Sequence, residues 1–401
     1  MLKNNLRIGI FWEQFEWGGV DTHIKYLLES WINSDDRFTI YFNSENKGAI
    51  RLKNEMNAKD IIFKEHNSLF TSKGSFFSFL VNPIKYIISI FKYCKILKHE
   101  KLDVIICQNG GYPAAYGVLA AIAAAYKVKI PARILVIHHQ ARKPILFTSL
   151  FRGFVDKITS KVSSSIVCVS KATLESLKKS TFLLENENIH SVVIDNWVPT
   201  FKDKEKKNLF DKKDDEKLIG VLGRIEEYKG HRDLIYSFSK LPDKIKKTNK
   251  ILIIGKGSDE NTRELKTIIR KLNLENEVLL KGYVEDKIEN IISSIDLLVM
   301  PTRSFEGFGY VIAEAMGIGT PVLASNVGAI KEFLSKEEGE IFEPGNINQL
   351  AECIIDFNNN NKKWIEKSKK AKIKIIEKFN PKKTVSEFRN HIYQKYLEGT
   401  K

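Results

Sequence analysis

The chain has 401 residues, which is too long for one ordinary hydrophobic core and suits two domains of about 150 to 200 residues each. Its composition, 43% hydrophobic and 28% charged, excludes a disordered protein. The sequence contains no run of about 18 uncharged apolar residues, so we expect no membrane-spanning helix. The formal net charge of +15 favours partners that carry negative charge.

Short apolar strands alternate with helical patterns in the first half of the chain. This alternation predicts a parallel sheet with helices on both faces, whose ligands bind beyond the carboxyl ends of the strands. The predicted strands are Leu6–Phe11, Phe38–Phe42, Val104–Cys107, Ile134–Ile137 and Ile166–Val169, and the predicted helices are Val20–Trp31 and Ala114–Tyr126.

The segment Phe76–Leu97 is aromatic and aliphatic but is interrupted by a proline and three lysines. Two interpretations stay open: an amphipathic helix packed on the sheet, or contact with a membrane surface. Just beyond it, Lys127–Lys179 holds 11 Lys and Arg against two Asp and Glu. Such a segment is either a solvated basic face or a surface for phosphorylated substrate or anionic lipid, and no zinc module or aromatic-basic ladder supports nucleic acid.

The pattern restarts after a charged stretch, Phe201–Lys217, which predicts a linker. The predicted strands of this second half are Leu218–Leu222, Ile251–Ile254, Val278–Leu280, Leu297–Met300 and Val322–Ala324, and a last amphipathic helix follows Pro381. We therefore expect domains at residues 1–199 and 200–380, with a C-terminal helix at 381–401. The natural place for a substrate is the groove between the two domains.

The spacing of the cysteines and the short apolar run near the N-terminus indicate the cellular compartment in which the protein is expected. Cys94, Cys107, Cys168 and Cys353 show neither C-x-x-C nor zinc-finger spacing, which predicts reduced thiols without a metal. The apolar run near the N-terminus is too short for a secretory signal. We expect a protein that stays in the cytosol.

The most informative motif begins at Pro301, directly after a predicted buried strand, and runs through a glycine-rich turn into a helix. The backbone amides of Gly307, Phe308 and Gly309 should lie at the N-terminus of that helix, where an anionic or oxygen-rich ligand is stabilised. Glu306 stands at the turn and Glu314 lies further along the helix. Two carboxylates so placed suit the hydroxyl groups of a sugar and a ribose.

Two other strand ends carry cationic side chains or glycines. Arg224 and Lys229 follow the strand Leu218–Leu222 and Gly223, and they can converge on one diphosphate. Gly255 follows the next strand in a G-x-G sequence that lacks the rest of a dinucleotide fingerprint, which argues against an NAD-dependent oxidoreductase.

The first domain has candidate residues after two of its strands. The turn at Gly18 and Gly19, between the first strand and helix, lets a phosphate approach the backbone. His138 and His139 come at the carboxyl end of the strand Ile134–Ile137, inside the basic segment. A pair of histidines in this position points to a function rather than to packing.

These segments together closely resemble glycosyltransferase family 4, the retaining enzymes with the GT-B fold, over nearly the whole chain. The matching segments are GGVDTHI from Gly18, His138-His139, Val169-Ser170-Lys171, Ile194-Asp195-Asn196, GRIEEYKG from Gly223, LIIGKGSD from Leu252, LKGYV from Leu280, and EGFGYVIAEAMGIGTPVLAS from Glu306. The resemblance implies two Rossmann-like domains that face a cleft, with the last helix crossing back to the first domain.

The resemblance also implies residue roles. Arg224 and Lys229 would clamp the diphosphate of a UDP- or GDP-sugar, Glu314 would bind the ribose and Val284 the edge of the base. Glu306, with the amides of Phe308 and Gly309, would hold the transferred sugar. Gly19 would approach the phosphates, and His138 or His139 would contact the sugar near the reacting carbon. Of the two histidines we favour His138.

Two departures from the family pattern stand out: Ala329 replaces the second glycine of G-G-x-x-E, and two adjacent histidines stand where one is expected. The chain has no D-x-D triplet, which fits transfer without a metal or other cofactor. The acceptor implied is a glycan or a lipid-linked sugar of capsule, lipopolysaccharide or teichoic material, reached at an anionic membrane surface. A nucleotide-sugar epimerase, a phosphorylase and a non-catalytic scaffold remain as alternatives.

Overall fold

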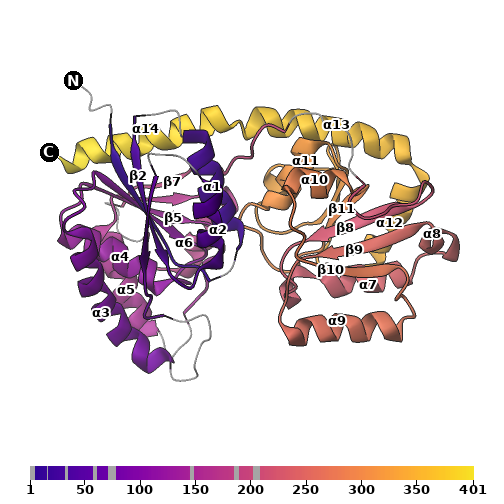
Figure 1. Cartoon of the computed structure of the whole chain (residues 1–401), viewed down its shortest axis with the longest axis horizontal. Helices are drawn as coiled ribbons and strands as arrows, with labels where there is room; N and C mark the ends of the chain where they lie inside the picture. The colour runs from indigo at the N-terminus through magenta and orange to yellow at the C-terminus, as the bar shows by residue number, and fades with distance from the viewer. Residues whose placement is uncertain are drawn as a thin grey trace. The chain divides into compact units, whose positions relative to one another are not determined.

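A computed structural model of the chain describes residues 5–15, 17–31, 35–56, 61–70, 78–144, 149–184, 189–201 and 208–401. The chain divides into two compact units, one formed by Met1–Trp197 with Pro381–Lys401 and the other by Val198–Asn380. Each unit has one parallel sheet covered by helices on both faces (Figure 1). Residues 202–207 of the expected linker, 76–77 of the apolar segment and 145–148 of the basic segment lie outside the described residues.

The first unit contains a seven-stranded parallel sheet in the order β3-β2-β1-β4-β5-β6-β7. The strands are β1 Arg7–Trp12, β2 Arg37–Asn43, β3 Ile61–His66, β4 Val104–Asn109, β5 Ala132–Ile137, β6 Ser165–Cys168 and β7 Ser191–Val193. The helices are α1 Gly19–Trp31, α2 Lys47–Glu55, α3 Ser78–Leu97, α4 Tyr116–Lys127, α5 Ser149–Val162, α6 Lys171–Ser180 and α14 Pro381–Gly399. Helices α3, α4 and α5 lie on one side of the sheet, and α1 and α14 lie on the other (Figure 1).

The second unit contains a six-stranded parallel sheet in the order β10-β9-β8-β11-β12-β13. Its strands are β8 Lys217–Leu222, β9 Asn249–Ile254, β10 Val278–Gly282, β11 Leu297–Met300, β12 Val322–Ser325 and β13 Glu340–Phe342. Its helices are η2 Glu227–Lys229, α7 His231–Ser239, α8 Asp243–Lys247, α9 Asp259–Lys271, α10 Ile288–Ser293, α11 Tyr310–Ile318, η3 Ile330–Glu332, α12 Ile347–Asn359 and α13 Asn361–Lys378. Helices α7 and α9 cover one face, and α10, α11 and α13 cover the other (Figure 1).

Both sheets are doubly wound, as the sequence predicts, and all the predicted strands are confirmed. In each sheet the strand order reverses between the strands that come first and fourth along the chain of that unit. These are β1 and β4 in the first unit, and β8 and β11 in the second. Loops that leave two such neighbouring strands diverge to opposite faces, so a ligand can reach the backbone between them. The topology alone therefore marks two places for sites, one in each unit.

Two of the three arginines in the basic segment Lys127–Lys179, Arg133 and Arg152, are structural. The guanidinium of Arg133 donates to the carbonyls of Val162, Ile130 and Pro131, at 2.6, 2.6 and 2.9 Å. Arg152 is buried, where its Nε donates to Asp156 at 2.9 Å and its guanidinium stacks over Tyr112. The expectation that the whole segment attracts anions is therefore too broad, because these two charges serve internal partners.

The buried carboxylate of Asp36 is one of the groups that hold helix α14 against the rest of the first unit. The side chain of Asp36 accepts hydrogen bonds from the amide of Leu6 at 2.8 Å, the indole of Trp31 at 3.0 Å and Nε of Arg389 at 2.8 Å. Burial would raise the pKa of Asp36, but the hydrogen bonds from Arg389, Leu6 and Trp31 outweigh it and hold the pKa below its usual value. The carboxylate therefore ties together the first strand, the first helix and the last helix.

Replacing Arg389 by Met should destabilise the first unit by about 2 kcal/mol at neutral pH, because a buried carboxylate loses its cation. The ion pair between Arg7 and Asp103 is the matched control, since Arg7 is largely exposed, and Arg7→Met should cost less than about 1 kcal/mol. Urea unfolding followed by tryptophan fluorescence measures this, because four of the five tryptophans lie in the first unit. Since the pKa of Asp36 is lowered, the effect of Arg389→Met should shrink as the pH falls through that pKa. Equal losses in both variants would contradict the clamp.

Candidate functional site

The strongest cluster of predicted residues lies at the carboxyl edge of the second sheet, where the strand order reverses. The segment from Gly223 to Gly230 leaves β8, and the segment from Pro301 to Gly309 leaves the neighbouring strand β11. These two loops are bonded to each other: the amide of Arg303 donates to the carbonyl of Tyr228 at 2.7 Å, and the Arg303 guanidinium pairs with Asp233 at the start of α7. These contacts hold the two loops in fixed positions at the carboxyl edge of the sheet and form a platform.

Lys229 and Glu306 meet across these loops in a direct ion pair. Both side chains are largely buried, and Oε1 of Glu306 also accepts from the hydroxyl of Thr302 at 3.0 Å. Burial lowers the pKa of Lys229, but the carboxylate of Glu306 and the neighbouring Tyr228 reverse this, so the net pKa lies above its usual value. Lys229 therefore carries a fixed positive charge at neutral pH.

Glycines allow the loops to approach this closely. Gly230 has φ of +73°, and a Cβ atom there would lie 1.9 Å from the carbonyl oxygen of Pro301. Gly328, after β12, has φ of +53°, and a Cβ atom there would lie 2.1 Å from the carbonyl oxygen of Glu306. The amide of Ala329 donates to that same carbonyl at 2.8 Å. The alanine that departs from the family pattern therefore still holds the backbone of Glu306.

The predicted glycine-rich turn does lead into a helix. Gly309 caps α11 with φ of +86°, and the helix begins at Tyr310, four residues after Glu306. Phe308 is buried against the rings of Tyr310, Phe333 and Phe379, which fixes the turn. Glu314 is buried in α11. An N-terminus held in this way is suited to an oxygen-rich ligand.

The remaining predicted residues of this unit are less tightly joined. Nη1 of Arg224 pairs with Glu226 at 2.7 Å, and its side chain is 48% exposed. Gly255 lies against Gly223, where a Cβ atom on Gly255 would be 1.9 Å from the carbonyl oxygen of Gly223. Val284 is half-buried after β10, two strands away from β8. The structure therefore joins Lys229 to Glu306, while Arg224 reaches toward solvent from the same loop.

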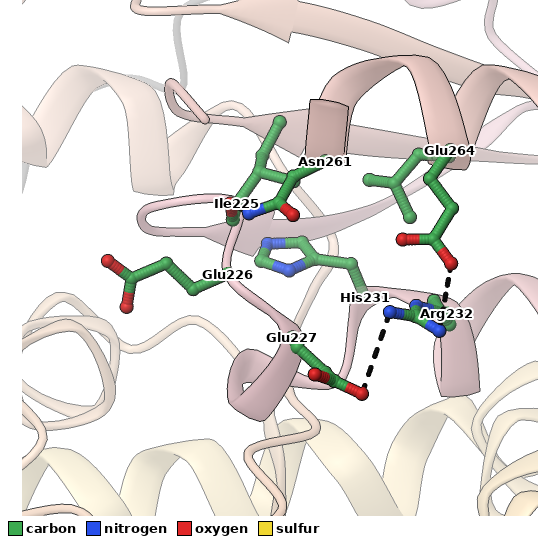
Figure 2. Close-up of a pocket in the computed structure, with 8 residues that line it drawn as sticks. Ile225, Glu226, Glu227, His231, Arg232, Asn261 and Glu264 are labelled. Atoms are coloured by element: carbon green, nitrogen blue, oxygen red, sulfur yellow. Dashed lines mark hydrogen bonds and ion pairs between the residues drawn. The ribbon is translucent and has the colours of Figure 1, made fainter. Parts of the chain in front are cut away.

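A pocket opens beside the same loop (Figure 2). It is lined by Ile225, Glu226, Glu227, His231, Arg232, Asn261, Glu264 and Leu265, none of which was a predicted site residue. Arg232 pairs with Glu264 at 2.9 Å and with Glu227 at 3.7 Å. Burial, together with the charge of Lys229, lowers the pKa of His231 to about 4, so this ring is neutral at pH 7. Arg232, Glu227 and Glu264 are thus paired with one another within the pocket, whereas Glu226 is paired with Arg224.

In the first unit, the predicted turn at Gly18 and Gly19 begins α1 after β1. The amide of Gly18 donates to Asp21 at 2.8 Å, and Asp21 also accepts from the indole of Trp12 at 3.2 Å. Burial raises the pKa of Asp21 to about 7, although these hydrogen bonds partly offset it. The buried carboxylate of Asp21 therefore holds the backbone of the turn through the amide of Gly18.

The two predicted histidines differ in their surroundings. His138 is buried after β5, whereas His139 is half-buried. Nε2 of His138 lies 2.6 Å from Oε1 of Gln108 at the end of β4. Because an amide oxygen only accepts, His138 carries its proton on Nε2, and the buried Nδ1 has no partner among the described residues. Burial, and then the adjacent His23, hold the pKa of His138 well below its usual value.

Several residues of these sites were missed by the sequence reasoning: Gln108, His23, Asp21 and Thr302. Their rings and side chains come from separate elements, as with His23 of α1, whose ring lies 4.6 Å from that of His138. Asp21 and His23 stand inside the predicted GGVDTHI segment and Thr302 follows Pro301, so the signal was present at those positions. Nothing in the local sequence marks Gln108. Within the described ranges, no group of His, Cys, Asp and Glu side chains could hold a metal ion.

Comparison with known proteins agrees with the resemblance to glycosyltransferases found in the sequence. Residues 202–374 match the family model of the glycosyl transferases group 1. The capsular polysaccharide biosynthesis glycosyltransferase CapM of Staphylococcus aureus is 29% identical over 288 residues, which cover 68% of this chain and 74% of CapM. The poly(ribitol-phosphate) alpha-N-acetylglucosaminyltransferase of S. aureus strain COL is 26% identical over 299 residues, which cover 74% of this chain and 56% of that protein.

The fold has close counterparts among solved structures. Alr3699/HepE of Anabaena, solved in complex with UDP and glucose, matches this chain with a TM-score of 0.73 and 17% identity. The match covers 96% of this chain and 99% of HepE, and at this identity it shows the fold alone. The family match, the sequence relatives and the two doubly wound sheets agree: residues 202–374 match the glycosyl transferases group 1, and the chain as a whole has the GT-B fold.

Proposed function

We propose that this protein transfers a sugar from a UDP-sugar to a glycan or lipid-linked acceptor of a cell-surface polysaccharide, with retention at the anomeric carbon and without a metal ion. The observation that carries the proposal is the buried pair of Lys229 and Glu306 beside the N-terminus of α11. A cytosolic enzyme acting at the membrane surface belongs to the same proposal.

The leaving group sets the chemical requirement. Cleavage of the sugar–phosphate bond builds negative charge on a nucleoside diphosphate, and a cation fixed in advance stabilises that charge without reorganisation. Lys229 is such a cation, because its partner Glu306 and the platform of the two loops hold it in place. Arg224, exposed on the same loop, supplies a second cation that can form a fork with phosphate oxygens. Two cations so placed do the work that a metal ion does in other transferases.

The carboxylates provide the sugar contacts. Glu306 at the turn and Glu314 inside α11 can accept hydrogen bonds from hydroxyl groups of the transferred sugar and of the ribose, with the amides of Phe308 and Gly309 as donors. In the first unit, the family resemblance assigns the contact with the sugar near its reacting carbon to His138 or His139, and Gln108 holds the ring of His138 in place. No covalent intermediate is required: the acceptor hydroxyl can attack on the face that the diphosphate leaves, the bond between the sugar carbon and the phosphate oxygen breaks, and the hydroxyl proton passes to that departing phosphate oxygen.

The choice of UDP and of a surface polysaccharide has support from the relatives. HepE was solved with UDP and glucose, and the two S. aureus relatives are named for capsule biosynthesis and for poly(ribitol-phosphate). These are properties of those proteins, and here they motivate the first substrates to test.

Replacing Lys229 by Ala should lower kcat by about 100-fold or more, because the developing charge on the diphosphate loses its fixed cation. The measurement is release of the nucleoside diphosphate from the donor sugar, with circular dichroism to verify folding. Lys240→Ala, at an exposed lysine that follows α7, is the matched control and should leave turnover unchanged. A Lys229→Ala enzyme with turnover close to the wild type would refute the clamp.

UDP should raise the melting temperature of the wild-type protein more than GDP or ADP does, because a ligand that binds only the folded state stabilises it. At a concentration about 100 times Kd the stabilisation is about 2.7 kcal/mol. Glu314→Gln should weaken the UDP effect while leaving the melting temperature without nucleotide nearly unchanged. A larger shift with GDP would overturn the choice of UDP, and no shift with any nucleotide would overturn the donor site.

Gln108 should position His138 for the reaction. Gln108→Leu removes the acceptor of the Nε2 proton, and we expect kcat to fall about tenfold with little change in KM for the donor. Gln108→Glu places a carboxylate beside the ring, which raises the pKa of His138 and should move the acid limb of the kcat profile to higher pH. Gln394→Leu, at an exposed glutamine of α14, is the control. An unmoved acid limb in Gln108→Glu would show that Gln108 is only structural.

A further inference from the structure

The outer face of α3 carries a straight apolar stripe. Its exposed large side chains are Val81, Ile84, Ile87, Ile88 and Phe91, and the exposed fraction is 62% for Ile84 and 58% for Phe91. The inner face of the same helix is buried in the core through Tyr86, Ile90 and Tyr93. The helix therefore has its packing face already filled, and the apolar stripe is additional to what the fold needs.

The stripe continues into lysines. At helical spacings of three and four, Val81, Ile84, Ile88 and Phe91 are followed by exposed Lys95 and Lys98. The ammonium of Lys127, at the end of α4, lies 5.4 Å from the centre of the Phe91 ring. Helix α3 contains no acidic residue. The apolar surface is thus bordered by positive charge.

Helix α5 repeats this arrangement. Leu150, which is 90% exposed, and Phe154 are followed at the same spacings by exposed Lys157 and Lys161. The single acidic residue of α5, Asp156, is buried and paired with Arg152. Helices α3 and α5 lie on the same side of the first sheet (Figure 1), both contact α4, and the rings of Tyr86 and Phe151 join them. The two stripes therefore belong to one surface.

The two stripes also run in the same direction. Each helix connects two parallel strands, so each begins at the carboxyl edge of the sheet and ends at the opposite edge. The apolar residues lie in the first part of each helix and the lysines in the last part. The apolar end of the surface is consequently on the edge of the sheet at which Gln108 and His138 lie.

We propose that the outer faces of α3 and α5 form a docking surface for a bilayer that contains anionic lipid. Apolar side chains with lysines around them match an interface in which acyl chains lie beneath anionic headgroups. A second copy of this chain fits less well, because two such surfaces would bring their lysines together. When the apolar ends of α3 and α5 enter the bilayer, the carboxyl edge of the first sheet lies nearer to the lipid than the opposite edge does.

The docking surface shares no residue with the donor site of the second unit, so the two can be tested apart. This surface goes beyond the proposed transfer reaction and, together with it, requires that the acceptor be presented at a membrane. No helix within the described residues is long and apolar enough to cross a membrane.

The test is flotation of the full chain with vesicles of pure phosphatidylcholine and with vesicles that also contain about 30% phosphatidylglycerol. We expect binding to the anionic vesicles and at least tenfold less to the neutral ones. The double variant Ile84→Ser and Phe91→Ser should reduce binding at least tenfold, and Lys157→Glu with Lys161→Glu should do the same. Ile373→Ser with Ile376→Ser, at exposed isoleucines of α13 in the second unit, is the matched control and should bind like the wild type.

Equal binding of the stripe variants and the wild type would overturn the proposal, and so would equal binding to both kinds of vesicle. A concentration-dependent dimer, seen by light scattering and lost in the Ile84→Ser and Phe91→Ser variant, would instead identify the surface as an interface between copies. Release of UDP from a soluble donor should be unchanged in all stripe variants. If that release fails in the wild type as well, the proposed function fails while the vesicle result still decides the docking surface.

Discussion

The ion pair between Lys229 and Glu306 is the interaction on which the second unit's site depends. Each partner alone would be a buried charge at a cost of several kcal/mol, and together they hold the loops after β8 and β11 in register. The close approach needs Gly230 and Gly328, since a side chain at either position would collide with a carbonyl oxygen. Under the proposed function, the same pair would supply the positive charge for the diphosphate and the carboxylate for the sugar of the donor.

The two units place different kinds of side chain at the edge of the sheet where the strand order reverses. Both place functional side chains where the strand order reverses, but the second unit gathers charges while the first gathers neutral polar groups. His138 is kept neutral by burial and by His23, and Asp21 has a pKa of about 7. Under the proposed function, this difference would match the charged diphosphate of the donor and the neutral hydroxyl groups of the sugar. The outer helices of the first unit add a third feature, a surface of apolar stripes and lysines.

The sequence predicted the elements whose signal is local. Strands such as Leu297–Met300 are buried on both faces and read as continuous apolar runs, so they were found. The strands β3, β7 and β13 were missed because they lie at or near the edges of the sheets, are only partly buried and are short or polar. Among the site residues, Lys229 and Glu306 were found through a motif, whereas Gln108 lies in a strand with nothing to distinguish it.

The sequence by itself determined the doubly wound sheets, the glycine turns and the residues of the donor motif, because strand alternation and turn chemistry depend on neighbours along the chain. Only the tertiary structure decided which charges meet. It paired Lys229 with Glu306, 77 residues apart, and left Arg224 with Glu226. It also turned Arg133 and Arg152 inward while Lys157 and Lys161 stayed exposed. Burial and distance set the strength of a charge interaction, and neither is written in the order of the residues.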